Sequence, residues 1–169
     1  ILNMCRHLGL EAQISADERD ICNADKLIIP GVGHFKKGMD NLRESGLQVV
    51  LDEEVLTKKK PVLGICLGAQ LMTMHSEEGD AQGLEWIPAN TIRFDAAQLG
   101  KLRIPHMGWA EVMLQDKNPL WQDLPPEPRF YHVHSYHFQF ADPSMISATA
   151  HYGYEFACAF QKDNIYGVQ

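Results

Sequence analysis

Short apolar runs alternate with segments of helical periodicity along the first half of the chain. Residues 26–29 and 62–65 are mostly apolar runs of strand length, which is typical of strands buried in a parallel sheet. A further short strand is expected over 11–14. Apolar residues recur at helical spacing in four other segments, which predicts helices over 1–8, 35–42, 47–56 and 67–74. This alternation favours a parallel sheet with helices on both faces.

Strand-like segments dominate the second half. Strands are expected over 91–94, 129–136, 145–151, 156–161 and 165–169. Turn signals separate several of them, which indicates a partly antiparallel arrangement. The fold class is therefore α/β, with a mostly parallel central sheet and an antiparallel, strand-rich C-terminal half. We interpret residues 1–169 as a single domain truncated at both ends, because the chain starts directly in a helix and stops within a strand.

Composition and charge narrow the possible functions. The chain has 169 residues and a net charge of −7, with 15 Lys and Arg against 22 Asp and Glu. This balance argues against nucleic-acid binding and against a basic membrane-surface protein, since both need clustered positive charge. No apolar run is long enough to cross a membrane. The four cysteines lack paired spacing, which argues against a disulfide framework and favours a cytoplasmic location: Cys5, Cys22, Cys66 and Cys158.

The clearest chemical signal is the segment 64–70, Gly-Ile-Cys-Leu-Gly-Ala-Gln, which directly follows an apolar run. A cysteine flanked by glycines between a strand and a helix is typical of a nucleophile exposed on a tight turn. The helix start behind Cys66 is expected to favour the thiolate. The alternative is a buried cysteine that packs as a small apolar residue. The glycines and the strand–turn–helix context favour the nucleophile.

A cysteine nucleophile that attacks an acyl carbon needs hydrogen-bond donors for the oxyanion. The backbone N–H of Leu67, at the helix start, is one candidate. A second is the loop Pro-Gly-Val-Gly at 30–33, because its glycines permit a close approach of the backbone. That loop is equally consistent with an ordinary turn. It is not a phosphate-binding loop, because no Gly-Lys-Ser/Thr follows it.

Several histidines are candidates for the proton shuttle. In a strand over 129–136, His132 and His134 share one face, and His137 lies on the other. A metal site on that pair lacks a nearby Asp or Glu to complete it, so structural or substrate-contacting histidines are favoured and no metal is expected. His34 and His106 have no evident partner. No His–acid pair stands out as a catalytic dyad.

Five motifs together carry a family resemblance. They are Pro-Gly-Val-Gly-His-Phe at 30–35, the cysteine segment at 64–70, Pro-His-Met-Gly-Trp at 105–109, His-Ser-Tyr at 134–136 and Tyr-Gly-Val-Gln at 166–169. The chain resembles the class I (triad) glutamine amidotransferases over essentially its whole length. Within them, it is most similar to the glutaminase subunits of imidazole glycerol phosphate synthase or a close paralogue. The resemblance implies a flavodoxin-like three-layer sandwich.

The resemblance also implies a reaction and a set of roles. Cys66 would attack the carboxamide of glutamine, form a thioester and release ammonia, and water would then release glutamate. No cofactor is implied. The oxyanion would be held by backbone N–H groups of Leu67, Val32 and Gly33, and the bound glutamine would contact Gln70, Glu78, Ser135 and Tyr136. Taken by itself, Glu78 belongs to an acidic run that could equally be solvated, whereas Gln70 lies one helical turn after Cys66.

One element of the family pattern would lie beyond Gln169. In the family, Gly-Val-Gln is followed by Phe-His-Pro-Glu, which supplies the catalytic histidine and the glutamate that orients it. The sequence ends at Gln169. We therefore expect that it belongs to a longer protein. Residues 1–169, without that dyad, would not sustain turnover by themselves.

The resemblance implies a partner and leaves alternatives open. The partner would be a cyclase subunit that receives ammonia in histidine biosynthesis, in a heterodimer with an interface that includes His106, Met107 and Trp109. One alternative is a paralogous glutaminase that supplies ammonia for amidation of a surface-polysaccharide sugar. Others are a non-catalytic binding module and an unrelated cysteine hydrolase, such as a thioesterase or peptidase.

Overall fold

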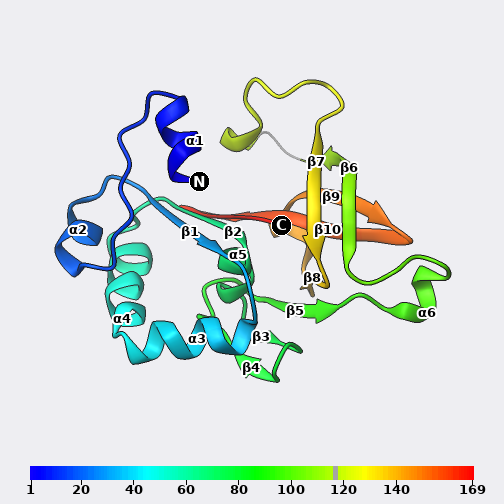
Figure 1. The fold of residues 1–169 in the computed structure, drawn as a ribbon, viewed down its shortest axis with the longest axis horizontal. Helices are drawn as coiled ribbons and strands as arrows, with labels where there is room; N and C mark the ends of the chain where they lie inside the picture. The colour runs from blue at the N-terminus through cyan, green and yellow to red at the C-terminus, as the bar shows by residue number, and fades with distance from the viewer. Residues whose placement is uncertain (116–117) are drawn as a thin grey trace.

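The computed structural model describes residues 1–115 and 118–169 (Figure 1). The first half confirms the predicted alternation of strands and helices. Its elements are α1 (Leu2–His7), α2 (Glu18–Asn23), β1 (Leu27–Gly31), α3 (Phe35–Glu44), α4 (Leu47–Asp52), a π-helical turn (Glu53–Thr57), β2 (Val62–Cys66) and α5 (Leu67–Leu71). The strand predicted over 11–14 is wrong, because this segment is irregular and pairs with no described strand.

The second half contains most of the strands. They are β3 (His75–Ser76), β4 (Ala81–Gln82), β5 (Ala89–Arg93), β6 (His106–Leu114), β7 (Arg129–His134), β8 (Tyr136–Phe140), β9 (Ile146–Tyr152), β10 (Tyr154–Lys162) and β11 (Ile165–Val168), with the short helix α6 (Ala96–Leu99) after β5. Single 3₁₀ turns cover Pro119–Trp121 and Pro143–Met145. The predicted strand 129–136 is instead two strands that meet at Ser135.

The sheet is mixed, and its parallel part is small. Along the main path the strand order is β1-β2-β11-β10-β8-β5-β3-β4. Strands β1 and β11 both run parallel to β2, and β3 runs parallel to β5, whereas the remaining pairs are antiparallel. The α/β class is confirmed, with the expected parallel arrangement confined mainly to β1, β2 and β11. Since β2 lies between two parallel partners, its C-terminal end is surrounded by the ends of β1 and β11.

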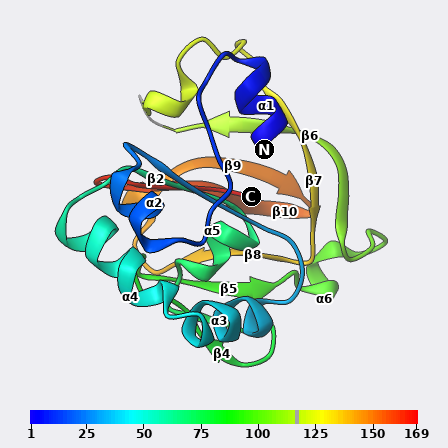
Figure 2. The same cartoon turned by 60° about the vertical axis from the view of Figure 1, so that its left-hand side comes forward.

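Strands β6 and β7 form a two-stranded ribbon beside the main path. β6 pairs with β7 at one end and with β9 at the other, which curls the sheet away from β1 and β2 (Figure 2). The sequence did not predict β6, because apolar residues lie on both of its faces and Gly108 interrupts the pattern.

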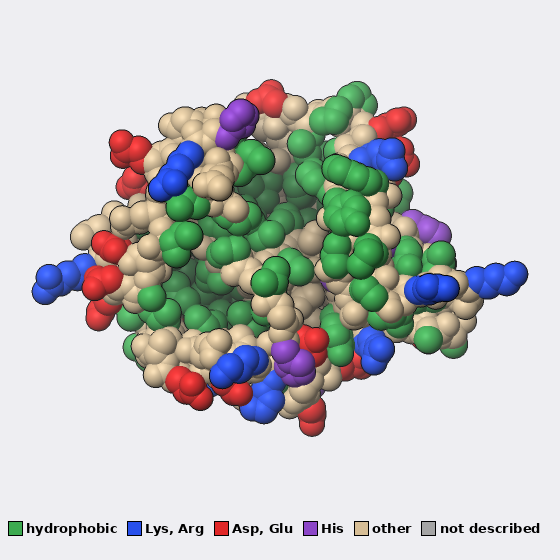
Figure 3. Space-filling model, in the orientation of Figure 1, with side chains coloured by type: hydrophobic (Ala, Val, Ile, Leu, Met, Phe, Trp, Pro, Cys, Tyr) green, Lys and Arg blue, Asp and Glu red, His purple; other side chains and the backbone are tan. Residues whose placement is uncertain are grey.

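The core has two parts. The larger one joins α3, α4 and α5 to β1 and β2, with Phe35, Met39 and Trp86 almost fully buried. The smaller one lies between β6, β9 and β10 and is built around Phe94 and Phe156. Hydrophobic side chains also gather at the surface, over the centre of the face in Figure 3 and over the β6–β7 ribbon on its right.

Candidate active site

Cys66 lies on a strained turn between β2 and α5. Its backbone has φ 52° and ψ −116°, in the left-handed range of φ that few residues other than glycine adopt. The flanking glycines are required by close packing. A Cβ at Gly68 would lie 1.7 Å from the carbonyl oxygen of Ile29, and one at Gly64 would lie 2.6 Å from Cα of Ala69. The predicted strand–turn–helix around the cysteine is therefore confirmed as a backbone arrangement.

The thiol of Cys66 is half-buried, and its protonation differs from the expectation. Burial raises the pKa of Cys66, and Glu78 raises it further. Hydrogen bonds from the Leu67 backbone and from the Gln169 side chain lower it, but desolvation is the larger effect. The expected preference for the thiolate is thus wrong for this arrangement, because the helix start does not outweigh burial. The nucleophile needs a base to remove its proton.

A chain of hydrogen bonds connects Cys66 to the predicted glutamine-binding residues. Nε2 of Gln169 donates to Sγ of Cys66 at 3.4 Å. Nε2 of Gln70 donates to Oε1 of Gln169 at 3.0 Å and approaches the carbonyl oxygen of Tyr136 at 3.5 Å. Gln70 is 4% exposed. The fold therefore brings Gln70, Tyr136 and Cys66 into one polar network.

Glu78 is held in place despite the acidic run around it. Its Oε2 accepts a hydrogen bond of 2.7 Å from the backbone N–H of Phe35, at the start of α3. Its charge also raises the pKa of Tyr136, for which burial is the first cause. A fixed carboxylate near Cys66 differs from the freely solvated side chain that the run alone suggested.

Ser135 is half-buried, and its carbonyl oxygen accepts the N–H of Phe94.

The glycine loop after β1 lies against the cysteine turn. Gly31 pairs with Cys66 across β1 and β2. A Cβ at Gly31 would lie 2.9 Å from the Gly68 nitrogen, so the two backbones are in close contact. Val32 is 92% exposed, and Gly33 has φ 114°. The loop with both predicted oxyanion donors therefore begins at the same sheet edge as the nucleophile.

The rings of three histidines lie around the ring of Phe94: His106, His134 and His137. The rings of His134 and His137 lie 5.3 Å and 4.8 Å from the Phe94 ring. The prediction that His137 lies on the opposite face from His132 and His134 is wrong. The first strand ends at His134 and a second strand begins after Ser135, so the alternation of faces does not continue across Ser135. Burial lowers the pKa of His132 to about 4 and that of His134 to about 3, so both are neutral near neutral pH.

His106 is not a surface residue. It is 3% exposed, and its ring stacks on Tyr152 at 4.0 Å. The prediction that it contributes to a partner interface is therefore corrected, because strand alternation turns it inward. The same alternation turns Met107 and Trp109 outward, where they are 60% and 64% exposed.

The outer face of the β6–β7 ribbon is apolar. Met107 pairs with Val133 across the strands, and Trp109 pairs with Tyr131. The rings of Trp109 and Tyr131 meet edge to face at 5.7 Å. Each of these four side chains is more than half exposed. We call them the ribbon patch.

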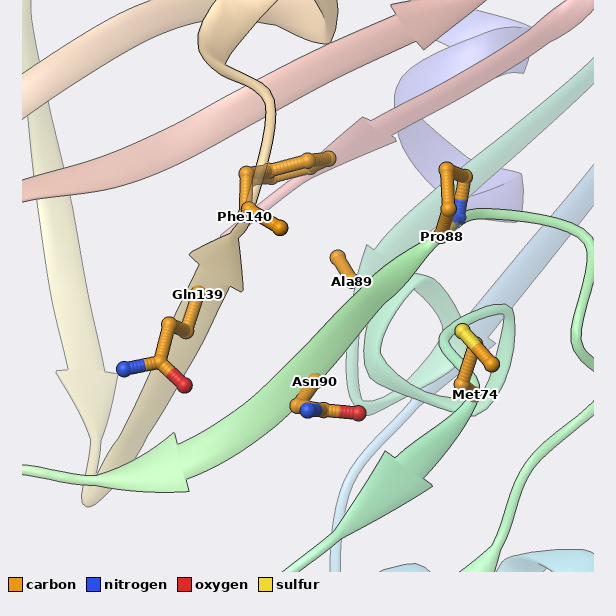
Figure 4. Close-up of a pocket in the computed structure, with 7 residues that line it drawn as sticks. Met74, Pro88, Ala89, Asn90, Gln139 and Phe140 are labelled. Atoms are coloured by element: carbon orange, nitrogen blue, oxygen red, sulfur yellow. The ribbon is translucent and has the colours of Figure 1, made fainter.

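The pocket in Figure 4 lies apart from these residues. It has a volume of about 380 Å³ and is lined by residues of β5 and β8 and by Met74. Asn90 and Gln139 are its polar side chains, and no predicted site residue lines it. This pocket is not part of the candidate active site.

Comparisons with known proteins agree on the class. The family model for "Glutamine amidotransferase class-I" matches residues 1–169. The chain belongs to this family, and it is a glutamine amidotransferase. A solved structure described as a glutamine amidotransferase matches 99% of this chain and 80% of its own length, with a TM-score of 0.75 at 14% identity, which supports the fold alone.

Individual relatives point to one branch of the family. The chain is 44% identical to imidazole glycerol phosphate synthase subunit HisH 2 of Pseudomonas aeruginosa, over 100% of this chain and 83% of the relative. It is 47% identical to the HisH 2 subunit of Methanococcus maripaludis, with the same coverage.

The described helices include none long and apolar enough to span a membrane.

Sequence reasoning missed two features of this site. It did not assign a role to the Gln169 side chain. The signal for one was the strand expected over 165–169: a strand that runs parallel to β2 ends beside Cys66, and so does Gln169. It also did not bring His106 to His132 and His134, because that contact depends on a strand pairing over residues far apart in sequence.

Proposed function

We propose that this chain is the glutaminase subunit of an imidazole glycerol phosphate synthase and supplies ammonia to a cyclase subunit in histidine biosynthesis. The single observation that carries the proposal is the placement of Cys66 on a strained turn, where its sulfur accepts a hydrogen bond from Gln169, which in turn accepts one from Gln70. The HisH relatives, at 44% and 47% identity over the whole chain, support this choice of synthase.

The proposed chemistry begins at the sulfur of Cys66. Sγ attacks the carboxamide carbon of glutamine, and the thiol proton passes to a base. The tetrahedral intermediate collapses to a thioester as the amide nitrogen takes up a proton and leaves as ammonia. Water then attacks the thioester, which releases glutamate and restores the thiol. Because burial raises the pKa of Cys66, the base controls the first step.

Backbone groups on both sides of the turn are suited to hold the oxyanion. The N–H of Leu67 already contacts the sulfur, and the loop with Val32 and Gly33 starts next to Cys66. Gly33 adopts a φ of 114°, which frees this backbone to present an N–H toward the site. We assign these N–H groups to the oxyanion.

The substrate glutamine is proposed to displace the bonds among Gln169, Gln70 and Tyr136. Gln70 and the Tyr136 carbonyl would then bind its polar groups, and Glu78 would attract its ammonium group. Ser135 lies between the end of β7 at His134 and the start of β8 at Tyr136, and we assign it to the same glutamine-binding region. β11 runs parallel to β2, so the family's residues after Gly-Val-Gln would lie beside Cys66.

The ribbon patch is proposed as part of the cyclase interface. An apolar cluster with two aromatic side chains is the composition expected at the centre of a stable interface. The sequence analysis already assigned Met107 and Trp109 to this interface. We add Tyr131 and Val133, because they lie opposite Trp109 and Met107 on the paired strand.

Selective labelling of Cys66 tests the proposal. An electrophilic glutamine analogue should modify Cys66, and protection by glutamine should slow it. Cys22, which is exposed, serves as an internal control, because a general thiol reagent should label it and the analogue should not. Equal labelling of the two cysteines, or labelling of Cys66 by short peptides and thioesters, would contradict the glutaminase assignment.

A further inference from the structure

Three histidines converge on the inner face of the β6–β7 ribbon. His106 pairs with His134 across the strands, and His132 lies two residues before His134 on the same face. Their exposed fractions are 3%, 6% and 2%. One ring nitrogen from each lies within 4.8 Å of the others. The ribbon therefore presents the histidines inward and the ribbon patch outward.

Two ring nitrogens of this cluster have no hydrogen-bond partner. They are Nδ1 of His106 and Nε2 of His132, both buried among the described residues. A buried polar atom without a partner destabilises a fold. Such atoms call for an explanation, and a cation bound by Nδ1 of His106 is one that suits its lone pair.

His134 is oriented as a metal ligand would be. Its Nδ1 lies 2.7 Å from the carbonyl oxygen of Tyr136, so that nitrogen carries the proton and donates it. Nε2 then holds the lone pair. Metal-binding histidines commonly donate their other N–H to a backbone carbonyl in this way. The same contact fixes Nε2 toward the other two rings.

The spacing of two nitrogens already suits a common ion. Nε2 of His134 lies 3.2 Å from Nδ1 of His132, and in the structure as it stands Nδ1 donates its proton to Nε2. A bound ion would take the place of this proton, and Nε2 of His132 would then carry the proton of that ring. Two nitrogens on one tetrahedral ion, each at about 2.0–2.1 Å, are separated by about 3.3 Å. A third nitrogen, from His106, lies within 4.8 Å of the other two, and metal binding would draw it closer by about 1.5 Å.

The sequence indicated no metal because His132 and His134 lacked a further ligand, and the structure adds His106 to them. We propose that His106, His132 and His134 bind a divalent transition-metal ion of the Zn²⁺ class. Three neutral imidazoles without a carboxylate suit Zn²⁺, Co²⁺, Ni²⁺ or Cu²⁺ and disfavour Mg²⁺ and Ca²⁺. The ion ties β6 to β7 behind the ribbon patch. It also fixes His134, whose partner carbonyl on Tyr136 faces Gln70. The site is separate from the thiol chemistry of Cys66.

The test is Co²⁺ binding to the protein expressed from its gene without a histidine tag. After removal of metals by a chelator, one Co²⁺ per chain should bind with the visible absorption of tetrahedral coordination, and Zn²⁺ should displace it. The His132→Phe variant should lose affinity by on the order of 100-fold, because one of three ligands is removed. A wild-type protein that does not bind Co²⁺ would overturn the proposal.

Two control variants test whether other side chains bind the Co²⁺ instead. Cys66→Ser removes the thiol, and His75→Gln removes the exposed His75–Asp80 pair, so both should retain the Co²⁺ spectrum. Loss of the spectrum in either control would overturn the site. X-ray absorption on the wild-type Co²⁺ complex gives a second readout that does not depend on folding of His132→Phe. Three imidazole nitrogens are expected in the shell, and a sulfur ligand would contradict the proposal.

Discussion

Nε2 of Gln169 donates a hydrogen bond to Sγ of Cys66, at 3.4 Å. β11 ends at Val168 and is parallel to β2, so it delivers Gln169 to the sheet edge that carries the nucleophile. The bond stabilises the thiolate and opposes the desolvation that raises the pKa of Cys66. The reactivity of the cysteine is therefore set by a balance between burial and a few donors.

Replacement of Gln169 should shift this balance. In Gln169→Ala the thiolate loses one donor, so the pKa of Cys66 rises further and less thiolate is present at a given pH. The pH profile of iodoacetamide alkylation at Cys66 should move to higher pH relative to wild type. Cys22 in the same sample is the control, and its profile should not move. A shift of the Cys66 profile to lower pH would contradict the role of this bond.

Gly68 should be intolerant of any side chain. A Cβ there would lie 1.7 Å from the Ile29 carbonyl oxygen, so Gly68→Ala forces α5 away from β1. A loss of stability on the order of 3 kcal/mol or more is expected in urea unfolding. Gly38→Ala is the matched control, because its Cβ would meet the flexible Leu71 side chain at 3.2 Å and helix propensity favours alanine. Equal effects of the two changes would contradict the packing argument.

A buried ion pair should make the protein sensitive to acid. Glu54 is 1% exposed and contacts Lys58 at 2.6 Å and Lys60 at 2.7 Å. These bonds lower the pKa of Glu54 from 4.5 to about 2. Because the folded pKa is lower than the unfolded one, the stabilisation is complete above pH 4.5 and disappears as the pH falls toward 2.

The Glu54→Gln variant tests this dependence. It should be less stable than wild type at pH 7, and the difference should shrink between pH 4.5 and 2, as followed by thermal unfolding in acid. Asp163→Asn, at an exposed turn, is a control that should leave the pH dependence of stability unchanged. A difference between Glu54→Gln and wild type that stays constant over this range would contradict the ion-pair account.

Truncation of the ribbon patch should weaken the synthase complex. Trp109→Ala removes an exposed aromatic side chain that packs on Tyr131, and it should reduce affinity for the cyclase partner by about 2 kcal/mol, or about 30-fold. Isothermal titration calorimetry with the partner measures this. Val49 is also exposed, at 73%, and lies outside the ribbon patch, so Val49→Ala should bind the partner as wild type does. Unchanged affinity of Trp109→Ala for the partner would show that the ribbon patch is not part of the interface.

Local patterns predicted the part of the fold that holds the nucleophile. The apolar run before Cys66 and the glycines on either side of it define β2, the turn and α5, because short-range sterics determine this geometry. The bond between Glu78 and Phe35, 43 residues apart, could not be predicted in this way. Neither could the meeting of His106 with His132 and His134, since both contacts require the assembled sheet.

The preference of Cys66 for its thiol form was also beyond the sequence. The turn and the helix start indicate a thiolate, but the degree of burial of the sulfur depends on the assembled sheet, in which β1 and β11 flank β2. Desolvation depends on this burial, and no local motif encodes it.

The central claim is that Cys66 performs the glutaminase step, and the Cys66→Ser variant assayed with its cyclase partner tests it most directly. We predict that glutamine-dependent turnover falls by on the order of a thousandfold or more, because a serine hydroxyl is a far weaker nucleophile than a cysteine sulfur at the same site. Turnover supported by free ammonium should remain within about twofold of wild type, since the cyclase reaction does not use the thiol. Survival of glutamine-dependent turnover, or loss of both activities together, would contradict the account.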